Sequence, residues 1–221
     1  GPEDIWRKQY QRKQAGGYRE PFLNLPTTTK YIAGSFILVY LIMMFLPPQM
    51  QNWVMGNFAF VPGRFTGEMP FTPYTIFTPV TYMWLHGDIF HLGLNTVMLV
   101  AFGAGIERWF GGKRLLVMLI LCGLFGLAFH MIFFPTALNP VIGASGGISG
   151  FFAVILVMIN KGNWRGGSGP MGGGILPFAV LWVLISLMSA FMSGFGQGNI
   201  AWAVHIGGFA GGFLLMKPYL K

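Results

Sequence analysis

Six long apolar segments alternate with short, more polar connections along the chain. They cover roughly residues 30–46, 89–107, 113–134, 145–161, 175–193 and 201–217. A helix needs about 20 residues to cross the hydrocarbon core of a bilayer, with a range of about 17–25. Most segments reach that length once neighbouring residues are included, and the fourth and sixth are short at their outer ends. The pattern predicts an all-α membrane protein with six transmembrane helices.

The composition supports a membrane protein. Hydrophobic residues make up 54% of the chain and charged residues 9%, whereas soluble domains carry roughly a quarter charged residues. The mean hydropathy is +0.60. The single cysteine, Cys122, excludes an intramolecular disulfide and a cysteine-based metal cluster.

The net charge of +8 is distributed as expected for a protein that crosses the membrane several times. Basic residues precede the first segment, occupy alternate connections and end the chain, and only Arg64 lies elsewhere. They are Arg7, Lys8, Arg12, Lys13, Arg19, Lys30, Arg108, Lys113, Arg114, Lys161, Arg165, Lys217 and Lys221. Positive connections remain in the cytoplasm, so both termini are predicted to be cytoplasmic (N-in/C-in). This distribution disfavours a nucleic-acid surface.

The chain divides into three predicted regions. Residues 1–29 form a basic cytoplasmic tail, in which Gly1 and Pro2 are typical of a protease scar left by tag removal. Residues 30–217 form the six-helix core, and residues 218–221 form a cytoplasmic end. The glycine-rich stretch 166–174 is predicted to be a flexible cytoplasmic linker, because no Gly-Lys-Ser/Thr follows to make a phosphate loop.

The first outer connection, residues 47–88, is unusually rich in aromatic residues and proline. Aromatic enrichment is typical of a segment at the membrane interface, so this loop is predicted to be membrane-associated. A small extracellular subdomain with its own core is the alternative.

Four polar residues are predicted to lie deep in the membrane: Ser145, His91, Asn95 and His205. Counted at 1.5 Å per residue from the charged residues at the inner ends of their helices, Ser145 and His91 lie about 24 Å above the inner boundary. Asn95 and His205 lie about 18 Å above it. All four fall in the outer half of a core about 30 Å thick, where costly polar burial indicates function.

These residue types can perform acyl transfer. Ser145 is a candidate nucleophile and His205 the candidate base that takes its proton. Because no acidic residue is expected at the depth of His205, a Ser-His dyad is favoured over a triad. The backbone N–H of Ser145 at a helix start, with His91 and Asn95 on one face of another helix, can bind an oxyanion. The simpler alternatives are a helix-capping serine and a core histidine.

Two glycine pairs predict close helix contact. Gly146 and Gly150 are four residues apart on the fourth segment, and Gly208 and Gly212 are four apart on the sixth. Small residues at this spacing let helix backbones touch. If the two stripes meet, Ser145 and His205 lie on adjoining turns.

Together these motifs resemble the rhomboid intramembrane serine proteases, over about residues 30–217. The resemblance rests on His86-x4-His91-x3-Asn95, Gly143-Ala144-Ser145-Gly146 and Ala203-x-His205-x2-Gly208-x3-Gly212, in this order on six spans. It implies a Ser145 nucleophile and a His205 base. It also implies an oxyanion site of His91, Asn95 and the backbone around Ser145, Gly143 included. Glu107-Arg108 resembles a structural motif of the family, and the first loop resembles its membrane-embedded loop.

Two positions depart from the family pattern. Ser149 stands where many members have a tyrosine that packs on the catalytic imidazole, so Phe151 or Trp202 is expected to support His205. The Trp-Arg pair of the first loop is absent, although Arg64 is available. His86 is expected to tie down the first loop by a hydrogen bond, and His130 to be structural or interfacial.

Other functions are less well supported. No cofactor or metal is expected, because the spacing of His86, Asp88 and His91 does not match a zinc signature. An aspartyl protease is excluded because the chain has no intramembrane aspartates. A non-catalytic rhomboid relative that binds transmembrane clients remains an alternative, as does a small transporter, although the inverted repeats of a transporter are not evident.

The expected activity is hydrolysis of a peptide bond in or near a transmembrane segment of a client protein. The partners are therefore transmembrane protein substrates and the lipid bilayer, and the predicted location is a bacterial inner membrane. Movement of the fifth span and the loop 194–198 would admit the client. The sequence does not define the client or the oligomeric state.

Overall fold

The computed structural model describes residues 25–160 and 201–219, and these parts of the chain are helical apart from their connections. Three helices are long and apolar enough to cross a membrane, and two shorter apolar helices accompany them. They are α2 (Thr27–Phe45), the continuous segment Ile89–Phe110, α8 (Gly112–Phe133), α9 (Ser145–Asn160) and α11 (Ala201–Met216). They correspond to the predicted first, second, third, fourth and sixth spans. The predicted fifth span, the glycine-rich stretch and the loop 194–198 lie outside the described residues.

The second span is not one regular α-helix. It consists of α6 (Ile89–Met98), a π-helical turn η3 (Leu99–Gly103) and α7 (Ala104–Phe110). A π-helical turn adds a residue to the local helical repeat and therefore changes the register of the helix faces on its two sides. The sequence pattern did not predict this interruption.

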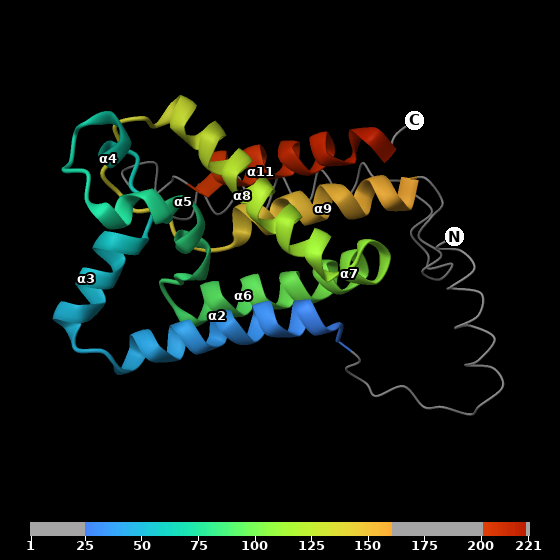
Figure 1. The fold of residues 1–221 in the computed structure, drawn as a ribbon, viewed down its shortest axis with the longest axis horizontal. Coiled ribbons are helices and arrows are strands. Elements are labelled where there is room, and N and C mark those ends of the chain that lie inside the picture. Colours follow the sequence, from blue (N-terminus) through green and yellow to red (C-terminus); the bar gives the residue numbers. More distant parts are fainter. Residues whose placement is uncertain (1–24, 161–200, 220–221) are drawn as a thin grey trace.

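The short helices α3 (Pro48–Phe58), α4 (Gly63–Thr66) and α5 (Thr78–Thr81), which follow α2 in the chain, lie together at one end of the molecule (Figure 1). The start of α2 and the ends of α9 and α11 lie at the opposite end. The first outer connection is folded into short helices between α2 and α6. These are α3, α4, η1 (Pro73–Phe77), α5 and η2 (Tyr82–Trp84), and a last turn, η4 (Lys217–Tyr219), follows α11.

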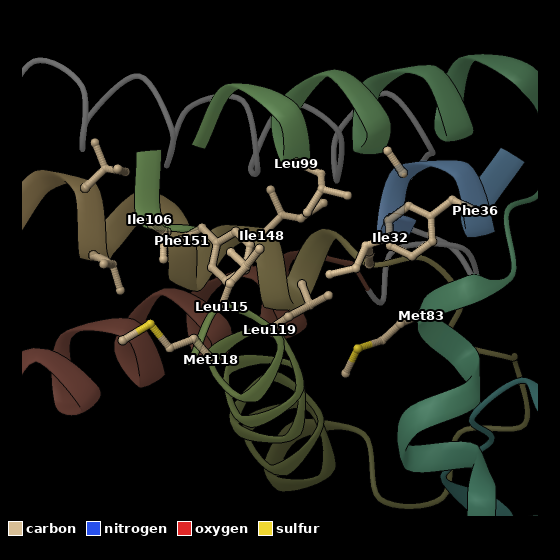
Figure 2. Close-up of a cluster of buried hydrophobic side chains, with 14 of the residues drawn as sticks. Ile32, Phe36, Met83, Leu99, Ile106, Leu115, Met118, Leu119, Ile148 and Phe151 are labelled. Carbon is tan, nitrogen blue, oxygen red and sulfur yellow. The ribbon is translucent and has the colours of Figure 1, made fainter. Parts of the chain in front are cut away.

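Helix α9 is the central helix of the described part. Every residue from Gly146 to Met158 is buried, whereas α2 buries only one face through Thr29, Ile32, Ala33 and Phe36. The rest of α2 exposes large apolar side chains, as expected where lipid is the solvent. The hydrophobic core lies between α9, α8, the second span and the inner face of α2 (Figure 2).

Glu107 joins the first span to the second. Its carboxylate accepts hydrogen bonds from the backbone N–H groups of Thr28 and Thr29 at 2.8 and 2.7 Å and from the Thr29 hydroxyl at 2.8 Å. Helix α2 has no capping side chain at its own N-cap, Pro26. A carboxylate from another helix therefore satisfies the free amides of its first turn. This contact agrees with the structural role expected of the Glu107-Arg108 motif.

The first loop is built around a buried strand-like segment and an exposed aromatic surface. Phe60 exchanges backbone hydrogen bonds with Val141, N–H to O at 3.1 and 2.7 Å, and both residues are buried. Arg64 donates to the carbonyls of Pro70 and Gly56 at 2.7 and 3.0 Å, which closes the loop on itself. The exposed aromatic residues are Trp53, Phe65, Phe71, Tyr74 and Phe77. The loop therefore has its own packed interior and also an apolar surface suited to the membrane interface.

Candidate active site

The candidate nucleophile and base are in hydrogen-bonding contact. Ser145 is the first residue of α9, and His205 lies in the second turn of α11. The distance between Ser145 Oγ and His205 Nε2 is 2.8 Å, although the two residues are sixty positions apart. A serine hydroxyl held against an imidazole nitrogen at this distance can transfer its proton as it attacks.

Glycine contacts between α9 and α11 bring these residues together. A Cβ at Gly208 would overlap the carbonyl oxygen of Gly146, and a Cβ at Gly212 would overlap that of Gly150. The two predicted stripes therefore meet, and the backbones approach closely because neither carries side chains there. His205 lies three residues before Gly208, so this contact fixes its level opposite Ser145.

The residues before Ser145 form a constrained turn. Gly143 has φ +97°, a conformation that L side chains rarely adopt, and its N–H donates to the carbonyl of Tyr82 at 2.9 Å. One turn into the helix, the Ser149 hydroxyl donates to the Ser145 carbonyl at 2.6 Å. The backbone on both sides of the candidate nucleophile is thus held by hydrogen bonds.

His91 and Asn95 lie beside this turn, as predicted. The His91 ring packs directly against Gly143, where a Cβ would overlap its Nε2. Asn95 is 3% exposed, and its Nδ2 donates to the His91 carbonyl at 2.8 Å. Asp88 caps α6 by accepting a hydrogen bond from the His91 N–H at 2.8 Å. One helix, α6, therefore delivers both side chains to the neighbourhood of the Ser145 turn.

The structure corrects the expectation for Gly143. Its amide was expected to join the oxyanion site, but that amide is already bonded to Tyr82. The first-turn amides of α9, beginning with Ser145, have no acceptor one turn earlier within the helix and point beyond its N-terminus. Gly143 instead contributes a turn that only glycine adopts readily and the space that the His91 ring occupies.

His86 belongs to the same group of side chains. Its ring centroid lies 5.1 Å from that of His91, with the two rings edge to face, and 5.3 Å from that of Phe36. The expected hydrogen bond is local, between Nδ1 and the Trp84 carbonyl at 3.2 Å. Burial, and secondly the neighbouring His91, lowers the pKa of His86 to about 4. The ring is therefore neutral at pH 7.

Other candidates have structural roles. His130 is fully buried, with its ring 5.1 Å from that of Phe134, which agrees with a structural role. Trp202 packs on Phe133 and Phe134 at the end of α8. Phe151 is fully buried in the core (Figure 2). The support of His205 by Phe151 or Trp202 stays a prediction.

The described residues contain no group of three or more His, Cys, Asp and Glu side chains that could hold a metal ion. Within this part of the chain Glu107 binds the start of α2, Asp88 caps α6, and Glu68 is exposed on the first loop. Around Ser145 the described residues supply a hydroxyl, imidazoles, an amide and backbone N–H groups.

Comparisons with known proteins identify the same part of the chain. The model of the rhomboid domain matches residues 73–221. Rhomboid protease GluP of Bacillus subtilis (strain 168) is 32% identical over 140 residues, which are 63% of this chain and 25% of that protein. Rhomboid-like protease 3 of Toxoplasma gondii is 26% identical over 212 residues, 91% of this chain and 72% of that protein. Inactive RHOMBOID-like protein 8 of Arabidopsis thaliana is 30% identical over 92 residues, 42% of this chain and 25% of that protein.

Proposed function

The chain belongs to the rhomboid family of integral membrane proteins, and on that premise we propose that it is an intramembrane serine protease with a Ser145–His205 dyad. The observation that carries this proposal is the 2.8 Å contact between Ser145 Oγ and His205 Nε2. Support also comes from two similar proteins that are named proteases, from Bacillus subtilis and Toxoplasma gondii.

In the proposed acylation step, Ser145 Oγ attacks the carbonyl carbon of a client peptide bond while His205 Nε2 takes the hydroxyl proton. The oxyanion of the tetrahedral intermediate receives hydrogen bonds from the Ser145 N–H and from the side chains of His91 and Asn95. His205 then returns its proton to the departing amine. The C–N bond breaks, and the acyl group remains on Ser145 as an ester.

Deacylation follows the same route with water as the nucleophile. His205 takes a proton from water as the oxygen attacks the ester, and the collapsing intermediate releases a carboxyl group and regenerates the Ser145 hydroxyl. A dyad suffices when packing orients the imidazole, which a carboxylate does in a triad. Here the α9–α11 glycine contact holds the helix that carries His205.

The proposed substrates are transmembrane segments of other proteins, cut at or near their outer ends, because Ser145 begins α9 and His205 lies in the second turn of α11, near the helix ends that are predicted to face outward. We propose that both termini face the cytoplasm, since the basic residues of the sequence precede the first span, occupy alternate connections and end the chain. The similar proteins come from a bacterium, a plant and an apicomplexan, so they do not favour the bacterial inner membrane over others.

The proposed domain limits, 30–217 for the core between residues 1–29 and 218–221, rest on the apolar pattern alone.

The proposal is tested by labelling the purified protein in detergent with a fluorescent fluorophosphonate. Wild-type protein should be labelled, and Ser145→Ala and His205→Ala should not. Ser149→Ala is the matched control for loss of a serine hydroxyl: Ser149 is one turn along the same helix and its hydroxyl donates to the Ser145 carbonyl, so labelling should remain, at a lower rate if that bond helps to hold the nucleophile. Folded wild-type protein that is not labelled, or Ser145→Ala that still is, would contradict a Ser145 nucleophile.

A non-catalytic relative that binds clients is the second candidate, favoured by the similarity to an Arabidopsis protein that is named inactive. The same experiment separates the two. An inactive protein that keeps the serine–histidine contact for packing would leave the probe unreacted, and its Ser145→Ala variant would bind a transmembrane client as well as wild type.

A further inference from the structure

Tyr82 is the residue on which the first loop, the turn before Ser145 and α8 converge. We propose that Tyr82 is a positioning residue for the nucleophile, acting through the Gly143 turn and the first turn of α9. This inference rests on the proposed function, because it assigns to Tyr82 a part in the reaction of Ser145. It also assigns a role to a residue that the sequence motifs did not single out.

The main chain of Tyr82 holds the turn. Its carbonyl accepts hydrogen bonds from the Gly143 N–H at 2.9 Å and from the Leu85 N–H at 3.2 Å. Gly143 is two residues before Ser145 and has φ +97°, so a shift of its amide changes the direction in which the chain enters α9. The position of the Tyr82 carbonyl therefore sets the orientation of the Ser145 hydroxyl.

The side chain of Tyr82 fixes the position of its own main chain. Tyr82 is fully buried, and its hydroxyl donates to the Gly123 carbonyl in the middle of α8 at 3.2 Å. That hydroxyl also lies under the first turn of α9, 3.5 Å from the place of a Cβ on Gly146. Burial raises the pKa of Tyr82, so the hydroxyl keeps its proton and remains a donor.

Neighbouring residues pack tightly around the contact between Tyr82 and Gly123. Met83 packs against Gly123 so closely that a Cβ there would overlap its side chain. Phe60 lies 6.5 Å from the Tyr82 ring, centroid to centroid, and its backbone pairs with Val141, just before the Gly143 turn. Tyr82 therefore connects α8 to both ends of the short segment 141–143.

The test compares Tyr82→Phe with Tyr74→Phe. Tyr82→Phe keeps the ring and removes only the bond to Gly123. Tyr74 is a tyrosine of the same loop that is 41% exposed and makes ring contacts with Trp53 and Phe58, so its hydroxyl is a suitable control. For each protein, fluorophosphonate labelling is followed over a range of probe concentrations. The fits separate the rate constant at saturation, the half-saturating concentration and the fraction of protein labelled.

We expect the saturating rate constant of Tyr82→Phe to fall about three- to tenfold, the range that corresponds to one neutral hydrogen bond. Its half-saturating concentration and labelled fraction should stay near wild type, and Tyr74→Phe should match wild type throughout. A role in folding alone would lower the melting temperature and the labelled fraction and leave the rate constant unchanged, and that result would overturn the proposal.

Amide hydrogen exchange gives a readout that does not depend on activity. Peptides covering residues 141–146 should exchange faster in Tyr82→Phe than in wild type and Tyr74→Phe, because the Gly143 N–H would be held less firmly. Unchanged exchange in this segment would overturn the proposal even if the rate fell. If wild-type protein is not labelled at all, the proposed protease function fails, and the exchange result then decides only whether Tyr82 holds the turn.

Discussion

Polar side chains inside an apolar helix bundle are costly, and around Ser145 most of them are held by a specific contact. Asp88 receives the His91 N–H, Asn95 donates to the His91 carbonyl, and Ser145 meets His205. Close to these residues, the Asn95 Oδ1 and the His86 Nε2 are buried with no hydrogen-bond partner among the described residues. These exceptions lie on α6 or in the loop before it, close to the candidate oxyanion donors. Polar groups kept there at a cost to stability are typical of a functional site.

Asn95→Ala is predicted to slow the reaction without unfolding the protein. The Asn95 amide has two N–H donors, of which one bonds His91 and the second is available to an oxyanion. Loss of one oxyanion donor costs roughly 10²–10³ in rate. The rate constant for fluorophosphonate labelling should therefore fall by about that factor.

Thr96→Val is the matched control for this substitution. It removes a neighbouring hydroxyl that has no partner among the described residues, so the rate should be unchanged and the melting temperature equal or higher. A normal rate in Asn95→Ala would remove Asn95 from the oxyanion site.

For single residues, the sequence predicted which side chains lie close together but not which backbone groups form hydrogen bonds. Ser145, His205, His91 and Asn95 could be selected because polar residues at similar depth on apolar helices are rare. The engagement of the Gly143 amide depends on a carbonyl sixty-one residues away, and no local pattern encodes such a contact. Tyr82 was missed for the same reason, since a tyrosine in an aromatic loop resembles its neighbours.

Glycine faces determine how the elements pack. Besides the α9–α11 contact, α8 takes part through Gly126, where a Cβ would lie 2.6 Å from the Val204 carbonyl of α11. Gly147 of α9 meets the Leu119 carbonyl of α8 in the same way, at 2.5 Å. Three helices therefore touch backbone to backbone around Ser145. Such packing replaces the hydrophobic driving force that is absent between helices in lipid.

Gly208→Ala is predicted to destabilise the protein and abolish labelling. The added Cβ would overlap the Gly146 carbonyl oxygen, which is backbone and cannot rotate away, so α11 must shift. Overpacking typically costs about 1–3 kcal/mol, and a shift of α11 also moves His205 from Ser145. Thermal unfolding in detergent, with labelling of the folded protein, measures both effects.

Gly34→Ala is the control for the glycine substitution. Gly34 lies in α2, where a Cβ would meet nothing within 4 Å, and alanine in a helix interior is favoured over glycine by roughly 0.5–1 kcal/mol. Its melting temperature should be equal or higher and its labelling normal. If the two variants behaved alike, the glycine contact would not be what brings the dyad together.

The sequence predicted the described spans to within a few residues of their observed ends, because apolar runs between charged residues define them well. The spacing of the glycine pairs indicated close helix packing but left open whether the two stripes meet each other, which they do. The π-helical turn and the short helices of the first loop were not predicted. Their formation depends on packing against other helices, which overrides weak local preferences.

The charges of the whole molecule lie unevenly at its two ends. Among the described residues, the end with the start of α2 and the end of α11 carries five basic residues and one acidic residue, Glu107. The five are Lys30, Arg108, Lys113, Arg114 and Lys217. The end with the first loop carries Arg64, Glu68 and Asp88. Because Lys and Arg are retained on the cytoplasmic side, this asymmetry predicts the orientation of the molecule and therefore the side from which clients are cut.

Single-cysteine accessibility checks this orientation. Cys122 is fully buried, so the wild-type protein provides an unreactive background for thiol probes. Glu68→Cys places a thiol on an exposed site of the first loop, and Lys217→Cys places one on an exposed site after α11. In sealed cells, a membrane-impermeant maleimide should label Glu68→Cys at once and Lys217→Cys only after permeabilisation. The reverse order would place the loop end, and with it the Ser145–His205 contact, on the cytoplasmic side, where the proposed cleavage at the outer ends of client helices could not occur.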